Sequence, residues 1–233
     1  MLAAGRGTRM GNLTSDLPKA MLPVNGTPLL EHILERLRAA GFERALIVTG
    51  YRAEQIEGHF AGYSMPLTFA RQEALNGTAT AALLAREFAG EDSFLLTFGD
   101  ILIEPEDYRH AVLLMESAEV DGVIAVKRVE DPYQGAAVYE ENGRVTRIIE
   151  KPPQGTSSTN WNSAGMYALR PGVFKELQRV PISERGEYEL TSALSQMLLN
   201  GKSLYIAEMR GAWRDVGRPE DLDATADLIR YPA

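Results

Sequence analysis

The chain has 233 residues, of which 45% are hydrophobic and 24% charged, a balance typical of a globular protein with a substantial core. Its net charge of -8 argues against a general nucleic-acid or membrane-surface binder, so any phosphate site must be a local concentration of positive charge. The sequence has no cysteine, which excludes disulfides, thiolate nucleophiles and zinc–thiolate sites and suits a cytoplasmic location. No apolar run approaches the length of a membrane span, and we therefore expect no membrane partner.

The first half of the chain alternates between amphipathic stretches and short apolar runs. Thr27 and Pro28 predict the start of a helix, and apolar residues at helical spacing continue it as far as Gly41. The pattern then predicts a strand at 45–49, a helix at 53–60, a strand at 67–70, a helix at 78–88, a strand at 94–98, a helix at 105–117 and a strand at 122–127. This alternation predicts an α/β fold with a Rossmann-like, doubly wound and mostly parallel sheet.

The pattern changes after residue 127. Two apolar segments flank the dipeptide Asn142-Gly143, which is a strong hairpin signal. The remaining predicted elements are hairpin strands at 136–139 and 145–149, a loop at 152–160, a strand at 164–169, helices at 171–179 and 188–199, a strand at 203–207 and a helix at 219–229. We interpret residues 1–233 as a single domain with parts at about 1–127, 128–210 and 211–233, the second being an inserted β portion.

A glycine-rich stretch, LAAGRGTRM at residues 2–10, opens the chain. Gly5 and Gly7 allow a tight turn and let backbone N–H groups come close to an anionic ligand. Arg9 and Lys19 add formal positive charge, and together these residues predict a triphosphate site. The stretch is neither a Walker A loop nor the dinucleotide fingerprint, because it lacks the Gly-Lys-Ser/Thr ending of the first and the third glycine of the second.

Only Met1, Leu2 and Ala3 precede this turn. A phosphate-binding turn of this kind normally follows a buried strand of about five residues. We therefore expect either that the first strand is abnormally short or that the chain is truncated before it.

Residues 2–19 resemble the signature of the sugar-1-phosphate nucleotidyltransferases, L-A-A-G-x-G-T-R followed by P-K. Further segments match this family in its order, and the resemblance extends from Leu2 to Asp221. These segments are Gln72 with Gly77-Thr78, Gly99-Asp100, Gly135 with Glu150-Lys151-Pro152, residues 162–167, residues 187–191 and residues 213–217. The resemblance implies a GT-A-like fold, with a nucleotide-binding part at about 1–127 and a sugar-binding part at about 128–210. Gln134 stands where the family usually carries an aromatic residue, so we expect a different sugar pocket.

The resemblance also implies an enzyme. In this family an oxygen of a sugar 1-phosphate attacks the α-phosphate of a nucleoside triphosphate, giving a nucleotide sugar and pyrophosphate. Two anions must approach each other, so the site needs charge neutralisation more than a proton shuttle. The implied cofactor is Mg²⁺, held by Asp100 and Asp215. The Gln72 side-chain amide offers a donor and an acceptor that can pair with the imide edge of uracil or thymine, and its flipped form could serve cytosine. The resemblance of Gln72 with Gly77-Thr78 to the uridylyl and thymidylyl branch of the family implies UTP or dTTP.

The remaining roles are likewise carried over from the resemblance. The catalytic residues are Arg9, on the β- and γ-phosphates, and Lys19, on the α-phosphate. The implied nucleotide-binding residues are Leu2, Ala3, Ala4, Gly5, Gly7, Thr8, Gln72, Gly77 and Thr78. The implied sugar-binding residues are Gly135, Glu150, Lys151, which would contact the sugar phosphate, and Asn162.

Two other functions are compatible with parts of the pattern. A cytidylyltransferase acting on a phospho-alcohol such as phosphocholine would need an aromatic pocket for the quaternary ammonium, whereas Glu150, Lys151 and Asn162 suit a polyol and a phosphate. A non-catalytic homologue that senses sugar nucleotides would have lost some of the residues assigned to catalysis and metal binding, and all of these are present. The sequence leaves open the sugar, the choice between UTP, dTTP and CTP, allosteric regulation, and whether the protein forms a homo-oligomer.

Overall fold

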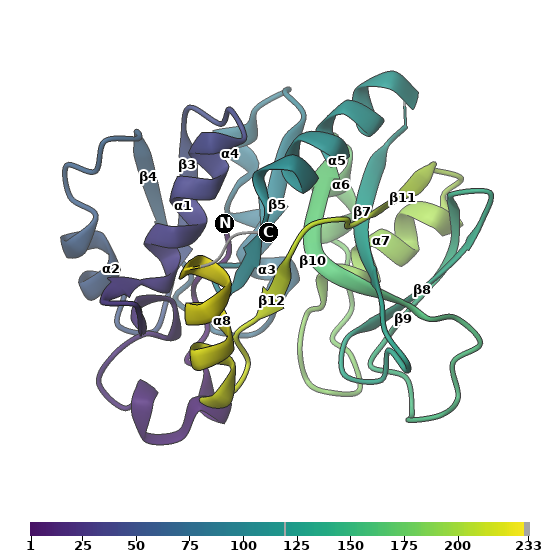
Figure 1. The fold of residues 1–233 in the computed structure, drawn as a ribbon. Helices are drawn as coiled ribbons and strands as arrows, with labels where there is room; N and C mark the ends of the chain where they lie inside the picture. Colours follow the sequence, from purple (N-terminus) through teal and green to yellow (C-terminus); the bar gives the residue numbers. More distant parts are fainter. Residues whose placement is uncertain (119, 231–233) are drawn as a thin grey trace. The chain divides into compact units, whose positions relative to one another are not determined.

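The computed structural model describes residues 1–118 and 120–230 (Figure 1). The chain forms two compact units, and each is assembled from segments that are distant in the sequence. The first unit contains residues 1–75, residues 97–109 and the chain from residue 210 onward, and the second contains residues 76–96 and 110–209.

A parallel sheet forms the core of the first unit. Strands β3 (Ala45–Thr49) and β4 (Leu67–Arg71) pair in parallel along their whole length, and every residue of β3 is buried. Leu2 adds parallel bridges to Val48 on one side and to Phe98 on the other. Its amide donates to the Thr97 carbonyl at 2.9 Å, so the short segment at the start of the chain is an inner strand with neighbours on both edges.

Helix α1 (Leu29–Ala39) packs against this sheet through the apolar residues that its periodicity predicts. Its start differs from the prediction. Thr27 does not cap the helix, because β2 (Thr27–Pro28) pairs instead with β1 (Pro23–Val24). Asn25 and Gly26, with φ angles of 53° and 84°, form the tight turn between them. This Asn-Gly signal is the one that the sequence analysis missed.

The other elements of the first unit come from all three of its segments. They are the 3₁₀ helices η1 (Thr8–Thr14) and η2 (Lys19–Met21), α2 (Ala53–His59), β6 (Ile101–Ile103), the start of α5 (Pro105–Ala118), β12 (Trp213–Asp215) and α8 (Glu220–Arg230). Strands β6 and β12 pair antiparallel, with Asp215 opposite Ile101. Neither strand was predicted, because three residues are too few to display a period.

The second unit is built on a mixed sheet. Its strands are β5 (Phe94–Thr97), β10 (Trp161–Leu169), β7 (Gly122–Arg128), β11 (Leu204–Glu208), β9 (Arg144–Glu150) and β8 (Ala136–Glu141), in that spatial order. Strand β8 also pairs with β10, which closes five of the strands into a ring. Strand β7 runs parallel to β11 and antiparallel to β10.

The predicted mostly parallel sheet is therefore wrong for this unit. An apolar run such as residues 122–127 indicates a buried strand, but it does not specify the neighbour, which is chosen by where distant segments return. Short helices accompany the sheet: α3 (Thr78–Leu83), α4 (Arg86–Ala89), α6 (Val173–Leu177) and α7 (Leu190–Leu199). The predicted helix at 78–88 is thus broken into α3 and α4. The hairpin at Asn142-Gly143 is confirmed.

No helix in the described part of the chain has the length and apolar character needed to cross a membrane.

Candidate active site

A cleft of about 260 Å³ opens over the glycine-rich loop of the first unit. It is lined by Leu2, Ala3, Gly5, Gly7, Thr8, Arg9, Lys19, Ala20, Gly99 and Asp100. Seven of these ten residues, all but Ala20, Gly99 and Asp100, belong to the segments that predicted a triphosphate site. The cleft lies where Leu2 and Phe98 leave the parallel sheet, and ligands of open α/β sheets bind at this edge.

Gly7 lets the loop approach the side chain of Lys19. Its φ of 71° lies in the left-handed region, and a Cβ atom at this position would stand 2.8 Å from the Lys19 Cβ. A larger residue would therefore be strained and would push Lys19 out of the cleft. The turn continues into η1, where the Gly7 carbonyl accepts from the Met10 amide at 2.9 Å and from the Thr14 hydroxyl at 3.0 Å.

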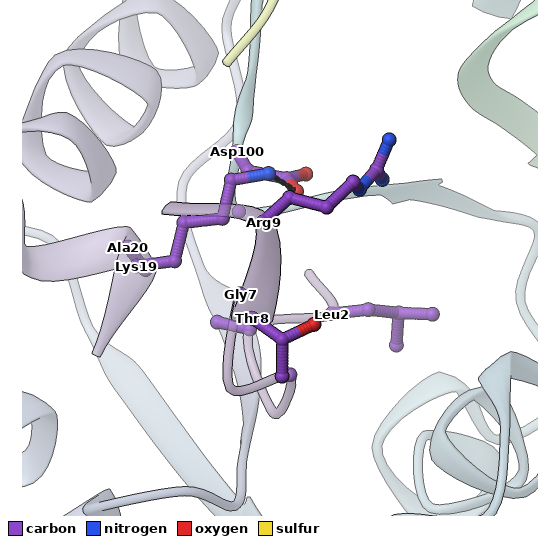
Figure 2. Close-up of a pocket in the computed structure, with 10 residues that line it drawn as sticks. Leu2, Gly7, Thr8, Arg9, Lys19, Ala20 and Asp100 are labelled. Carbon is purple, nitrogen blue, oxygen red and sulfur yellow. Dashed lines mark hydrogen bonds and ion pairs between the residues drawn. The ribbon is translucent and has the colours of Figure 1, made fainter. Parts of the chain in front are cut away.

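Lys19 and Asp100 form an ion pair in the cleft. The Lys19 Nζ lies 2.5 Å from Asp100 Oδ2, and the two side chains are 10% and 31% exposed. Figure 2 shows the ammonium at this carboxylate, beyond the loop that carries Gly7 and Thr8. The sequence analysis assigned these residues to different partners, a phosphate and a metal ion, and the structure brings them into direct contact.

Strand β12 brings Asp215 to the same place. The amide of Val216 donates to the Asp100 carbonyl at 2.9 Å, and Asp215 lies opposite Ile101 in the ladder with β6. Arg9 converges here as well: a Cβ on Gly217 would lie 3.9 Å from the Arg9 Nη1 and 3.8 Å from the Asp215 Oδ1. The two predicted metal ligands and the two predicted catalytic cations therefore gather in one place, although the sequence separates them widely.

The electrostatics of Asp215 reflect this crowding. Asp215 is an exposed residue, but partial desolvation of its carboxylate by nearby protein atoms and, next, the neighbouring Asp100 carboxylate raise its pKa to about 6, although Lys19 and Arg9 act in the opposite direction. Two neighbouring carboxylates that repel each other suit a hard cation. Among the described residues no group of three or more His, Cys, Asp or Glu is placed to hold a metal ion. Asp100 and Asp215 nevertheless fit Mg²⁺, which is commonly held by one or two carboxylates and completes its shell with phosphate oxygens and water.

The residues assigned to base recognition fall in different units. Gln72, which is 8% exposed, follows β4 in the first unit, and its backbone N–H donates to the Thr49 carbonyl at 2.8 Å. Gly77 and Thr78 open α3 in the second unit. The Thr78 hydroxyl accepts from the Leu190 amide at 2.9 Å, so this loop is tied to the start of α7.

The four residues assigned to the sugar gather at one end of the ring of strands in the second unit. Gly135 precedes β8, and its carbonyl accepts from the Lys151 amide at 2.7 Å. A Cβ at Gly135 would lie 2.3 Å from Asn162 Oδ1, so any larger residue would force the Asn162 side chain to move. Glu150 is the last residue of β9 and pairs with Ala136. Lys151 has a φ of 41°, a strained conformation for a lysine and one that is concentrated at functional sites.

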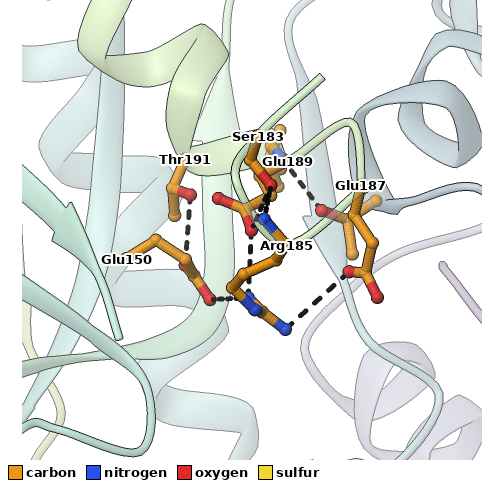
Figure 3. A network of polar contacts seen from close by, with 8 residues as sticks. Glu150, Ser183, Arg185, Glu187, Glu189 and Thr191 are labelled. Carbon is orange, nitrogen blue, oxygen red and sulfur yellow. Dashed lines mark hydrogen bonds and ion pairs between the residues drawn. The ribbon is translucent and has the colours of Figure 1, made fainter. Parts of the chain in front are cut away.

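Glu150 is held by a network that the sequence analysis did not identify. Its Oε2 accepts from the Thr191 hydroxyl at 3.1 Å, and its Oε1 lies 3.4 Å from the Arg185 guanidinium. Arg185 also pairs with Glu189 at 3.0 Å (Figure 3). Burial raises the pKa of Glu150, the Thr191 hydrogen bond lowers it, and Glu189 raises it further. The segment 187–191 matched the family pattern, but nothing in its spacing indicated which residue its side chains would contact.

Comparison with known proteins places the chain in a family. The Nucleotidyl transferase family matches residues 1–230. Among curated proteins, the chain is 34% identical over 234 residues to the low-salt glycan biosynthesis nucleotidyltransferase Agl11 of Haloferax volcanii, covering 98% of this chain and 65% of that protein. It is also 34% identical over 243 residues to the UTP–glucose-1-phosphate uridylyltransferase AglF of the same organism, covering 99% and 95%.

The bifunctional protein GlmU of Methanococcus maripaludis (strain C5) is likewise 34% identical, over 95% of this chain but only 52% of its own length. The chain thus spans about half of that relative and less than two thirds of Agl11.

Solved structures agree with the fold. A UDP-glucose pyrophosphorylase complexed with UDP-glucose superimposes with a TM-score of 0.88 at 24% identity, covering 98% of this chain and 96% of the other. A UDP-glucose pyrophosphorylase from Acinetobacter baumanii gives 0.86 at 23% identity, covering 97% and 90%. The family match covers residues 1–230, which include the glycine-rich loop that lines the cleft and the acidic residues Asp100 and Asp215. The chain therefore belongs to the nucleotidyl transferase family.

Proposed function

We propose that the protein couples a nucleoside triphosphate, UTP or dTTP in preference to others, to a sugar 1-phosphate and releases pyrophosphate. The observation that carries this proposal is the cleft in which the glycine-rich loop faces Lys19 and Asp100, with Arg9 and Asp215 beside them. Such a site presents backbone donors, two cations and a carboxylate pair to a polyanionic ligand.

The first unit supplies the residues for the triphosphate. The backbone N–H groups around Gly5 and Gly7 bind its oxygens, together with the neighbouring residues of the loop, Leu2, Ala3, Ala4 and Thr8. Arg9 contacts the β- and γ-phosphates and stabilises the departing pyrophosphate. Lys19 moves from Asp100 to the α-phosphate, a short transfer because both ends of the pair already line the cleft. The attacking phosphate is ionised at neutral pH, so the reaction needs no general base.

Asp100 and Asp215 are the residues that would hold Mg²⁺. When bound, Mg²⁺ supplies charge neutralisation for the phosphates that must meet. Two carboxylates would suffice to hold it, because Mg²⁺ is commonly bound through one or two protein carboxylates.

The second unit supplies the sugar site in this proposal. Glu150 accepts hydrogen bonds from sugar hydroxyls, and Asn162 completes the polar contacts. Gly135 allows close backbone approach, and Lys151 contacts the sugar phosphate. Base recognition is assigned to Gln72 in the first unit and to Gly77 and Thr78 in the second.

Several observations favour this function over the alternatives. AglF is named for a reaction of UTP with glucose 1-phosphate and is covered along 95% of its length. None of the relatives named above carries a name that specifies a cytidylyltransferase. A non-catalytic sensor would not be expected to keep Arg9, Lys19, Asp100 and Asp215 together in one place. The proposed setting is the cytoplasm, where nucleoside triphosphates are available, and a homo-oligomer is compatible with the proposal.

The test is pyrophosphate release by the purified protein with Mg²⁺, across a panel of triphosphates and sugar 1-phosphates. We expect release that requires both substrates, with UTP or dTTP giving a higher kcat/KM than ATP or GTP. The control is Arg9→Ala prepared in the same way, which excludes a contaminating activity. Absence of release with every pair would contradict the proposed reaction, and preference for a purine triphosphate would contradict the base assignment.

A further inference from the structure

Strand β12 carries the Asp215 carboxylate but is poorly fixed by its own pairing. It has three residues, Trp213–Asp215, and among the strands of residues 1–118 and 120–230 it pairs only with β6. A two-stranded ladder of this length is marginal by itself. A metal ligand must be held to about 0.5 Å, and residues outside the coordination shell usually provide this restraint.

A buried carboxylate holds the chain just before β12. Asp107, in the first turn of α5, is 3% exposed. Its Oδ1 accepts from the Arg210 amide and its Oδ2 from the Gly211 amide, each at 2.9 Å. Both oxygens are therefore used, and both bonds go to the backbone that leads into β12.

A second carboxylate holds the chain just after β12. Asp221, in the first turn of α8, accepts from the Gly217 amide at 2.9 Å and from the Arg218 amide at 2.8 Å. Both bonds end on the same oxygen, Oδ2. This oxygen is close to the metal ligand as well, because a Cβ on Gly217 would lie 3.7 Å from Asp221 Oδ2 and 3.8 Å from Asp215 Oδ1.

We propose that Asp107 and Asp221 are positioning residues that hold β12 from its two ends and so keep the Asp215 carboxylate beside Asp100. The inference rests on the proposed function, in which Asp100 and Asp215 share the metal ion. Neither positioning carboxylate contacts a substrate in this proposal; each acts through the backbone N–H groups whose hydrogen bonds it accepts. The charge of Asp221 also acts on the neighbouring Asp215, so the test must separate this electrostatic effect from positioning.

The different bonding of the two carboxylates gives a sharp test. In Asp107→Asn an NH₂ group must face one of two backbone N–H donors, so at least one bond is lost. In Asp221→Asn the remaining oxygen can accept from both amides, so the bonds survive while the charge disappears. Asp221 is the one whose accepting oxygen lies near Asp215. A purely electrostatic role would therefore predict a clear effect of Asp221→Asn. A positioning role predicts that, of the two Asn variants, only Asp107→Asn has an effect, and that Asp221→Ala, which removes both bonds, has one as well.

The readout is Mn²⁺ binding to the whole protein, followed by the EPR signal of free Mn²⁺. We expect about tenfold weaker binding in Asp107→Asn and Asp221→Ala, the scale for losing a partner of a metal ligand, and near-normal binding in Asp221→Asn. The Mg²⁺ concentration needed for half-maximal turnover should shift by the same factor, while the KM for UTP at saturating Mg²⁺ stays within about twofold. Thermal unfolding identifies the folded variants. If Asp107→Asn does not fold, the comparison of Asp221→Ala with Asp221→Asn makes the same test at the other end of β12.

The matched controls remove the charge of another carboxylate in the first turn of α5 and of α8. Glu106→Gln in α5 and Asp223→Asn in α8 alter exposed carboxylates of the same first turns and should leave Mn²⁺ binding unchanged. Equal weakening by Asp107→Asn and Asp221→Asn, or weakening by no variant, would overturn the inference. A wild-type protein that bound no Mn²⁺ would overturn the proposed metal site and this inference with it. A wild-type protein that bound Mn²⁺ and released no pyrophosphate would instead contradict only the proposed reaction.

Discussion

The Lys19 ammonium lies 2.5 Å from the Asp100 carboxylate, so a proposed phosphate contact is paired with a proposed metal ligand. Bringing substrate into the cleft would exchange this pair for a lysine–phosphate and a carboxylate–metal contact. The pair therefore neutralises the two charges within the cleft.

The pair predicts a non-additive effect on stability. Lys19→Met leaves the Asp100 carboxylate without its cation, and Asp100→Asn leaves the Lys19 ammonium, only 10% exposed, without its anion. We expect each single change to lower the free energy of unfolding by about 1 kcal/mol or more, and the double variant to cost less than the sum. Urea denaturation at neutral pH measures the coupling. Strict additivity would show that the pair does not contribute in solution.

The two acidic residues should matter far more for turnover than for folding. Replacing Asp100 or Asp215 by Ala removes a ligand of the proposed metal, and we expect kcat to fall at least about a hundredfold, on the scale of losing one strong electrostatic contact. For Asp215 the free energy of unfolding should change by only about 1 kcal/mol, because removing one of two neighbouring carboxylates also relieves their repulsion. Steady-state kinetics at several Mg²⁺ concentrations, with Asp223→Asn as the control, test this. Near-normal Mg²⁺-dependent turnover in either variant would contradict a shared metal.

Replacing Gly135 should weaken binding of the sugar 1-phosphate but not of UTP. In Gly135→Ala the new methyl group would meet the Asn162 side chain, 2.3 Å away if nothing moved, and displace it. We expect the KM for the sugar 1-phosphate to rise about tenfold, which corresponds to losing one good polar contact, while the KM for UTP changes little. Gly172→Ala is the control, because a Cβ there meets nothing within 4 Å. An equal rise in both KM values would argue against a sugar-specific role.

Thr191 should set the pH range over which Glu150 works. Its hydroxyl donates to Glu150 and lowers the pKa of that carboxyl against the raising effect of burial. In Thr191→Val the pKa of Glu150 should rise further. As the pH falls, the carboxylate that accepts sugar hydroxyls should then become protonated at a higher pH than in the wild-type protein. The acidic limb of the pH profile of kcat/KM for the sugar 1-phosphate should therefore move upward. Ser192→Ala, next to it in α7, is the control and should leave the profile in place. If the acidic limb of the profile did not move in Thr191→Val, the ionisation of Glu150 would not control sugar binding.

Gln72 should determine the base preference. In Gln72→Glu an ionised carboxylate keeps the acceptors but loses the amide donor. We expect kcat/KM for UTP to fall by about tenfold or more, the scale of an unmade buried hydrogen bond, with a smaller effect on ATP. Competition assays with paired triphosphates measure this ratio directly. An unchanged ratio of UTP to ATP would indicate that another group reads the base.

The sequence by itself determined many of the local elements and seven of the residues that line the cleft. The apolar run at 45–49, the helical spacing after Pro28 and the Asn142-Gly143 turn carry their structural signals within a few residues, and all are present in the structure. The glycine-rich stretch at 2–10 likewise specifies a tight turn wherever the rest of the chain lies, because its conformation depends on glycine and on little else.

Only the tertiary structure decided which distant residues meet. That β7 would lie between β10 and β11, that Asp107 would hold the chain before β12, and that Lys19 would pair with Asp100 all depend on how segments far apart in the sequence return to one another. Such contacts have no period and no local propensity, since a carboxylate that caps a helix turn and one that fixes a remote strand look the same in the sequence. Their partners are selected by the packing of the whole unit, which gains free energy from burying the apolar faces together and so brings these polar groups within hydrogen-bonding distance.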